Sequence, residues 1–165
     1  MPTDIDFSSP EKPLGKVSGA ALMRLQKELQ DFVSSSPAGL ELDEETLAGA
    51  DLGVWRVKMM GQVDTLYEGE KFTLQFKFNE KYPHDSPEVM FVGPLDTIPV
   101  HKHVYSNGHI CLSILAQGHW SPAFTVESVC HSILSMLGLF INYFKSDFTH
   151  LLMSLILVTL MINDY

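Results

Sequence analysis

The stretch Lys71–Asn79, KFTLQFKFN, decides the fold class. Large apolar side chains stand at every second position, namely Phe72, Leu74, Phe76 and Phe78. Polar residues fill the positions between them, beginning with Lys71 and Thr73. A period of two is typical of a strand that buries one face and exposes the other. The stretch therefore predicts a half-buried strand of an antiparallel sheet.

Two neighbouring stretches extend this sheet. VWRVKMM at residues 54–60 alternates in the same way, and the glycine-containing GQVDTLYEGE links it to Lys71–Asn79 as a hairpin connection. EVMFV at residues 88–92 is a third strand, entered through prolines that cannot lie inside a central ladder. Short connections predict an antiparallel meander. A fourth strand is expected around Val100, where Pro99 would confine it to an edge.

Helices are predicted before and after the sheet. Residues 18–34 have apolar residues at helical spacing, namely Leu22, Leu25, Leu29, Phe32 and Val33. Arg24 and Lys27 lie off this stripe and are expected in water, whereas residues 34–53 are expected to form a loop. The second helix begins near Thr125, ends near Gly138 and buries the stripe Val126, Val129, Cys130, Ile133, Leu134 and Leu137. This order of elements predicts an α+β fold.

The composition narrows the function. The chain has 165 residues, a length typical of one domain with a sizeable core, and a net charge of -9 without a basic run, which argues against nucleic-acid binding. Two cysteines cannot form the disulfide framework of a small secreted protein. Residues 1–17 contain acidic residues and prolines and no apolar core, so they predict a flexible arm and not a signal peptide. We therefore expect an intracellular protein.

The segment His101–Trp120, HKHVYSNGHICLSILAQGHW, contains four of the seven histidines and one of the two cysteines. His101 and His103, and likewise His109 and Cys111, are two residues apart, a spacing that places each pair on one side of an extended chain. Imidazole and thiolate groups suit zinc, but structural zinc sites usually contain more cysteines in tight knuckles. A single cysteine among histidines is also the pattern of a nucleophile. A zinc site, a reactive thiol and an ordinary structural segment all remain open on this pattern.

Several stretches resemble one family. YSNGHICLSIL and WSPAFTVESVCHSILSML are similar to the active-site segment of ubiquitin-conjugating enzymes, and RLQKEL, LYEGEKFTLQFKF and YPHDSPEVMF are similar to their first helix and sheet, in the same order. The resemblance covers residues 22–137. LYEGEKF, IPVH and HVYSNGHICLSIL are most similar to the W subfamily. The resemblance implies the ubiquitin-conjugating fold, in the cytoplasm or the nucleus.

The resemblance implies roles for three site residues. Cys111 corresponds to the cysteine that takes ubiquitin from an activating enzyme as a thioester, without a metal or a cofactor. His101 corresponds to the histidine of the family's His-Pro-Asn motif, which helps to hold the loop. His103 stands at the asparagine position, where its imidazole N–H could donate to a thioester oxygen. Ser113 replaces the aspartate that many members have two residues after the cysteine.

The replacement of the asparagine by His103 and of the aspartate by Ser113 affects which amino group can accept ubiquitin. Lysine, with a pKa of about 10.4, is neutral in roughly one of two thousand molecules at pH 7, whereas an α-amino group with a pKa of about 7.8 is neutral in about one of seven. An enzyme without help in deprotonation is therefore expected to favour α-amino groups, a preference for which the W subfamily is known.

Further partners follow from the resemblance. RING or U-box ligases contact the first helix and two loops of family members, and the corresponding positions here are Arg24, Lys27, Pro83, His84, Ser121, Pro122 and Ala123. The activating enzyme also docks on the first helix. The alternative is a non-catalytic variant of the same fold that binds ubiquitin or a ligase, although such variants usually lack the cysteine that this chain has.

Residues 139–165 depart from the family. Residues 151–162 are nearly all apolar, but this run is shorter than the roughly twenty residues that span a bilayer. Three hypotheses remain: a helix that packs on the core, a short membrane anchor, or the translation of an alternative or misread exon. The expected organisation is thus an arm at 1–17, a core domain at 18–138 and a hydrophobic tail at 139–165.

Overall fold

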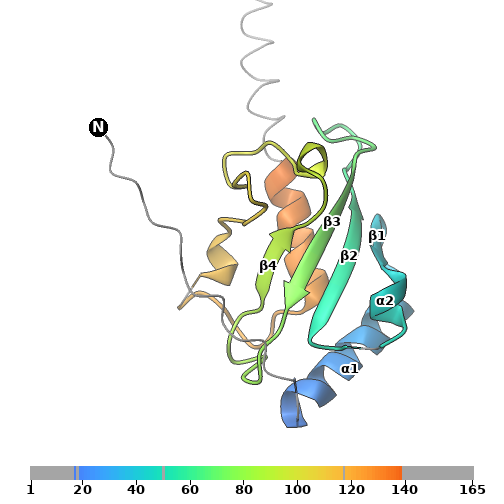
Figure 1. Ribbon diagram of the computed structural model, residues 1–165, viewed down its shortest axis with the longest axis vertical. Helices are drawn as coiled ribbons and strands as arrows, with labels where there is room; N and C mark the ends of the chain where they lie inside the picture. Colours follow the sequence, from blue (N-terminus) through green and yellow to red (C-terminus); the bar gives the residue numbers. More distant parts are fainter. Residues whose placement is uncertain (1–16, 18, 50, 117, 139–165) are drawn as a thin grey trace, which may run out of the picture.

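The computed structural model describes residues 17, 19–49, 51–116 and 118–138 (Figure 1). The tail at 139–165, and the predicted arm except for Val17, lie outside the described residues. Within the described ranges, no helix is long and apolar enough to cross a membrane.

A four-stranded antiparallel sheet in the order β1-β2-β3-β4 is the centre of the fold (Figure 1). Its strands are β1 (Leu40–Leu42), β2 (Val54–Met60), β3 (Lys71–Lys77) and β4 (Glu88–Phe91). β2 and β3 pair along their whole length, and β4 pairs with the other edge of β3. The predicted meander is therefore confirmed for these three strands.

One face of this sheet is buried. The register places Trp55 opposite Phe76 and Met59 opposite Phe72, so that apolar side chains from neighbouring strands stand side by side. These four residues are at most 3% exposed. Burying a large apolar side chain stabilises a fold by about 1.5–3 kcal/mol, so this face accounts for much of the stability.

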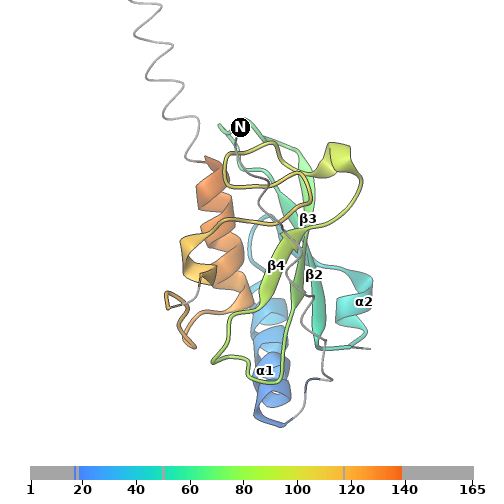
Figure 2. The ribbon, with the colours of Figure 1, turned by 60° about the vertical axis from the view of Figure 1, so that its left-hand side comes forward.

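Two helices cover the buried face: α1 (Gly19–Ser35) and a helix over residues 126–138, the last described element (Figure 2). The predicted stripe of the second helix is confirmed, since all six of its residues are buried. His131, which lies beside that stripe, is exposed. Along the chain, two short 3-10 helices come between β4 and this helix, η1 (Leu95–Thr97) and η2 (Ser113–Leu115).

The predicted loop at residues 34–53 is wrong in part, because it contains β1 and the short helix α2 (Glu44–Leu47). β1 pairs with β2, from Leu40 opposite Met59 to Leu42 opposite Val57. Asp43 caps α2 by accepting a hydrogen bond from the Thr46 N–H at 2.8 Å. Three residues are too few for a strand pattern to appear in the sequence.

Two further expectations are wrong. Val100 does not belong to a fourth strand: its side chain is 94% exposed, and its carbonyl accepts a hydrogen bond from the Tyr67 hydroxyl at 2.7 Å. Val33 is 55% exposed, because the buried face of α1 runs through Ala21, Leu25, Glu28 and Phe32. A charged residue thus takes a place on the stripe.

Candidate active site

Cys111 lies at the end of a narrow backbone hairpin. Its N–H donates to the His103 carbonyl at 2.8 Å, Val104 and Ile110 form a β-bridge, and the Tyr105 N–H donates to the His109 carbonyl at 2.9 Å. This register makes His103 and Cys111 direct partners across the hairpin. Two residues that are eight positions apart in the sequence thereby come together at one site.

A glycine seats this hairpin on the sheet. The Phe91 N–H donates to the Gly108 carbonyl at 2.8 Å, and Met90 forms a β-bridge with His109. Gly108 has φ +85°, a conformation that L side chains rarely adopt, and a Cβ atom there would overlap the carbonyl oxygen of Phe91. The Asn107-Gly108 turn is thus the point at which the loop meets β4.

His101 supports the same hairpin from inside. Its side chain is 8% exposed, and its Nδ1 accepts a hydrogen bond from the His103 N–H at 3.1 Å. Burial, together with the charges of His103 and Lys102, lowers the pKa of His101. The neutral ring with its proton on Nε2 fits this arrangement, because Nδ1 then acts as an acceptor.

The two cysteines have opposite environments. Cys111 is exposed, whereas Cys130 is fully buried on the 126–138 helix, and burial raises the pKa of the Cys130 thiol far above its usual range. The thiolate is the nucleophilic form of cysteine. Only Cys111, of the two, is therefore placed to react with a large partner.

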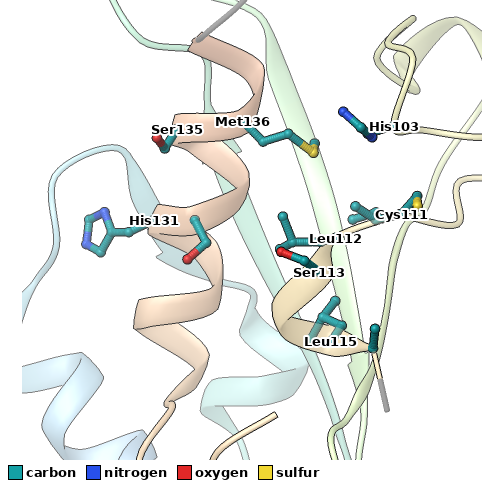
Figure 3. A pocket seen from close by; sticks show the side chains of 11 residues that line it. His103, Cys111, Leu112, Ser113, Leu115, His131, Ser135 and Met136 are labelled. Atoms are coloured by element: carbon teal, nitrogen blue, oxygen red, sulfur yellow. The ribbon is translucent and has the colours of Figure 1, made fainter. Parts of the chain in front are cut away.

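Cys111 opens onto a groove of about 830 Å³ between the hairpin, η2 and the 126–138 helix. Figure 3 shows His103 and Cys111 on one wall, with Met136 extending toward them from the helix. The groove is lined by His103, Ile110, Cys111, Leu112, Ser113, Leu115, Ala116, His131, Ser132, Ser135 and Met136. An open, largely apolar groove beside a thiol suits an extended peptide better than a small enclosed substrate.

The residues proposed as zinc ligands do not assemble a metal centre in the described part of the chain. No group of three or more histidine, cysteine, aspartate or glutamate side chains is placed there to hold a metal ion. The rings of His101 and His103 are 5.5 Å apart, but His101 is engaged by the backbone of the hairpin.

The three segments expected to contact ligases lie next to one another. The Trp120 indole N–H donates to the Pro83 carbonyl at 2.7 Å, which joins the Tyr82–His84 loop to the segment containing Ser121, Pro122 and Ala123. The Arg24 guanidinium donates to the Phe124 carbonyl at 3.2 Å and joins α1 to the same segment. Lys27, His84, Pro122 and Ala123 are exposed, and Pro83 and Ser121 are partly buried.

Arg24 differs from its prediction. It does not stay wholly in water: its side chain is 29% exposed and its Nε pairs with Glu28 at 2.5 Å. Glu28 itself was not expected as a site residue. Its position between Leu25 and Phe32, on the apolar stripe of α1, was the signal in the sequence that it would be buried with partners.

Comparisons with known proteins agree on one family. The model of the ubiquitin-conjugating enzyme family matches residues 24–142. Ubiquitin-conjugating enzyme E2 W of Caenorhabditis elegans is 55% identical over 122 residues, which cover 74% of this chain and 78% of the relative. Probable ubiquitin-conjugating enzyme E2 W-A of Danio rerio is 55% identical over 115 residues, which cover 70% and 74%.

Solved structures give the same result for the fold. Ubiquitin-conjugating enzyme E2 UbcA1 of Agrocybe aegerita is 41% identical, has a TM-score of 0.67, and is matched over 73% of this chain and 84% of that one. Human ubiquitin-conjugating enzyme E2 G1 is 31% identical, has a TM-score of 0.63, and is matched over 74% and 98%.

Proposed function

This chain belongs to the ubiquitin-conjugating enzyme family, in its W subfamily, and on this premise we propose that Cys111 carries ubiquitin as a thioester and passes it to protein amino groups. The observation that carries the proposal is the exposed Cys111 thiol, held by the backbone of His103 at the rim of an open groove. We propose that this takes place in the cytoplasm or the nucleus.

The first step is an exchange of thioesters. The Cys111 thiolate attacks the carbonyl carbon of the thioester between ubiquitin and the activating enzyme, and the activating enzyme's thiolate leaves. One thioester forms as another breaks, so no metal or cofactor is required. The cysteine side chain suits this step because its thiol ionises near neutral pH and its thioester stays reactive toward amines.

The second step is attack by an amine. A neutral amino group adds to the thioester carbon, loses a proton to solvent, and expels the Cys111 thiolate as the amide bond forms. His103 lies beside Cys111 across the hairpin, and its imidazole N–H is the proposed donor to the developing oxyanion. Ser113, at the rim of the groove, supplies no carboxylate to take up the proton.

The proposed acceptor is accordingly the α-amino group of a protein. Between pH 7 and pH 9 the neutral fraction of an α-amino group rises by only about seven-fold, whereas that of lysine rises by about a hundred-fold. In separate reactions, the enzyme charged with ubiquitin is mixed with two matched peptides. One has a free N-terminus and no lysine, and the other is N-acetylated and has one lysine.

Faster discharge onto the free N-terminus at pH 7, by about ten-fold or more, with the gap closing toward pH 9, is the expected result. Equal rates at pH 7 would show that the enzyme activates lysine and would contradict the proposed preference. The thioester proposal is judged separately, by whether the enzyme becomes charged at all.

The proposed partners are ubiquitin, its activating enzyme, a RING or U-box ligase and protein substrates. The adjacency of α1, the Tyr82–His84 loop and the Ser121–Ala123 segment supports a single ligase-docking surface. His84, where the family usually has phenylalanine, gives this surface a polar group at an exposed position.

A further inference from the structure

A buried carboxylate lies beneath the ligase-docking surface. Glu28 is 5% exposed, and it stands on the face of α1 that packs against the rest of the fold. A buried charge is costly unless it is paired and hydrogen-bonded. The hydrogen-bond partners of Glu28 therefore indicate its role in the fold.

Both oxygens of Glu28 are engaged by other segments. Oε1 accepts hydrogen bonds from the Tyr82 hydroxyl at 2.6 Å and from the Arg24 Nε at 2.5 Å. Oε2 accepts from the Val126 N–H at 3.0 Å, at the first residue of the helix that follows the Ser121–Ala123 segment. Burial and the hydrogen bond to Glu28 raise the pKa of Tyr82, so this hydroxyl remains a donor at every ordinary pH.

The two loops of the surface are also joined to each other. The Trp120 ring lies 6.2 Å from that of Tyr82 and 5.6 Å from that of Phe124, and its N–H bonds to the Pro83 carbonyl. These contacts hold one loop against the other but do not involve α1. Among the described residues, the hydrogen bonds that join α1 to the loop pair and to the Val126 N–H are made by Glu28 and by its partner Arg24. A further hydrogen bond, from the Ser35 hydroxyl to Glu127 at 3.1 Å, joins α1 to the 126–138 helix.

We infer that Glu28 is a positioning residue that holds the three segments of the ligase-docking surface in register, an inference that rests on the proposed function. Glu28 does not touch the ligase or Cys111. It orients Arg24, whose guanidinium then reaches the Phe124 carbonyl, and it anchors the residues on either side of the exposed contact positions.

Neither of the closest substitutes can take its place. Glutamine has one acceptor oxygen and one NH₂ group, so its NH₂ must face either the Val126 N–H or the Arg24 Nε–H, and in both cases two donors point at each other. Aspartate is one methylene shorter and cannot reach both. The carboxylate of glutamate is the group that accepts from all three partners at once.

The test measures ligase docking without charging. The uncharged protein is titrated with a RING domain, chosen from a panel as the one that binds the wild-type chain most tightly, by isothermal titration calorimetry. Glu28→Gln is expected to raise the Kd for the RING domain by about five-fold or more, because the surface loses the free energy of about one hydrogen bond that orients it. Tyr82→Phe removes one of the three donors and is expected to raise Kd by about two-fold.

Two controls separate positioning from a general loss of structure. Glu45→Gln removes a carboxylate that accepts from Arg56 at 2.8 Å, but this pair is exposed and lies at the β1–α2 edge, so Kd should not change. In Glu28→Gln, the amide NMR signals of Phe124 and Val126 should shift while that of Cys111 stays in place. The rate of ligase-independent discharge onto a small amine should also stay within about two-fold.

The outcomes decide between the claims. Unchanged Kd in a folded Glu28→Gln variant overturns the inference, as does an equal loss of ligase-independent discharge. If Glu28→Gln does not fold, unchanged Kd in Tyr82→Phe overturns it. If the wild-type chain binds no RING domain, the inference is also overturned. If the wild-type chain binds a RING domain but does not become charged with ubiquitin, the proposed function is refuted, and the titration alone decides the inference.

Discussion

Replacing Gly108 by alanine should damage both stability and activity, because this glycine seats the Cys111 hairpin on β4. The added Cβ would overlap the Phe91 carbonyl oxygen, which belongs to backbone and cannot rotate away. The hairpin must therefore move, which breaks the hydrogen bond from the Phe91 N–H to the Gly108 carbonyl.

Gly118→Ala is the matched control. Gly118 has φ +84°, nearly the φ of +85° at Gly108, but no atom of the described part of the chain lies within 4 Å of an added Cβ atom. Both substitutions cost about 1–2 kcal/mol for a left-handed alanine, offset in part by the stiffer unfolded chain. Gly108→Ala loses a further 1–3 kcal/mol or so, because the displaced hairpin gives up a hydrogen bond and leaves buried backbone groups without partners.

The two variants are compared by urea unfolding and by the single-turnover rate of charging with ubiquitin. Gly108→Ala should be about 1–3 kcal/mol less stable than Gly118→Ala and should charge more slowly by about ten-fold or more, since a misplacement of about 1 Å can cost a hundred-fold in rate. If both variants have equal stability and charge equally fast, then the close approach of Gly108 to Phe91 does not position Cys111, and the account of the hairpin is wrong.

Three more predictions address the rest of the chain. Cys130→Ala should still be charged, at a cost of about 1–2 kcal/mol in stability for the cavity, and loss of charging would show that Cys130 takes part in the reaction. Because the pKa of His101 is lowered in the fold, its contribution to stability is complete above the unfolded value near 6.5 and is lost as pH falls below it. The free energy of unfolding should therefore fall more steeply from pH 7 to pH 5 in the wild type than in His101→Gln, and parallel curves would refute this. A chain that ends at residue 145 should be more soluble than the full chain and still be charged, because the apolar run at 151–162 is absent, and a lower melting temperature with loss of charging would show that the tail belongs to the fold.

The sheet and the second helix could be predicted because their burial patterns are long and regular. β3 alternates over seven residues, and the 126–138 helix places six apolar residues on one stripe. β1 could not be predicted, since its three residues acquire their strand character from pairing with β2. The error at Val100 has a similar origin, because a tertiary hydrogen bond from Tyr67 determines the path of that segment.

The candidate site was predictable as a set of residues but not as an arrangement. The resemblance names Cys111, His101 and His103, but their proposed roles depend on the register of the hairpin, which places His103 opposite Cys111. The sequence did not reveal the contribution of Glu28. A charged residue on an apolar stripe signals burial, but its partners come from segments 54 and 98 positions away.

Whether Cys111 carries ubiquitin as a thioester is tested most directly by identifying the bond that forms at residue 111. Wild type, Cys111→Ser and Cys111→Ala are each incubated with activating enzyme, ubiquitin and ATP, and the products are identified by intact mass with and without reductant. We expect a reductant-sensitive adduct for wild type, a reductant-resistant and alkali-labile ester for Cys111→Ser, and no adduct for Cys111→Ala. A reductant-sensitive adduct on Cys111→Ala would contradict this expectation, because ubiquitin would then be carried by another thiol.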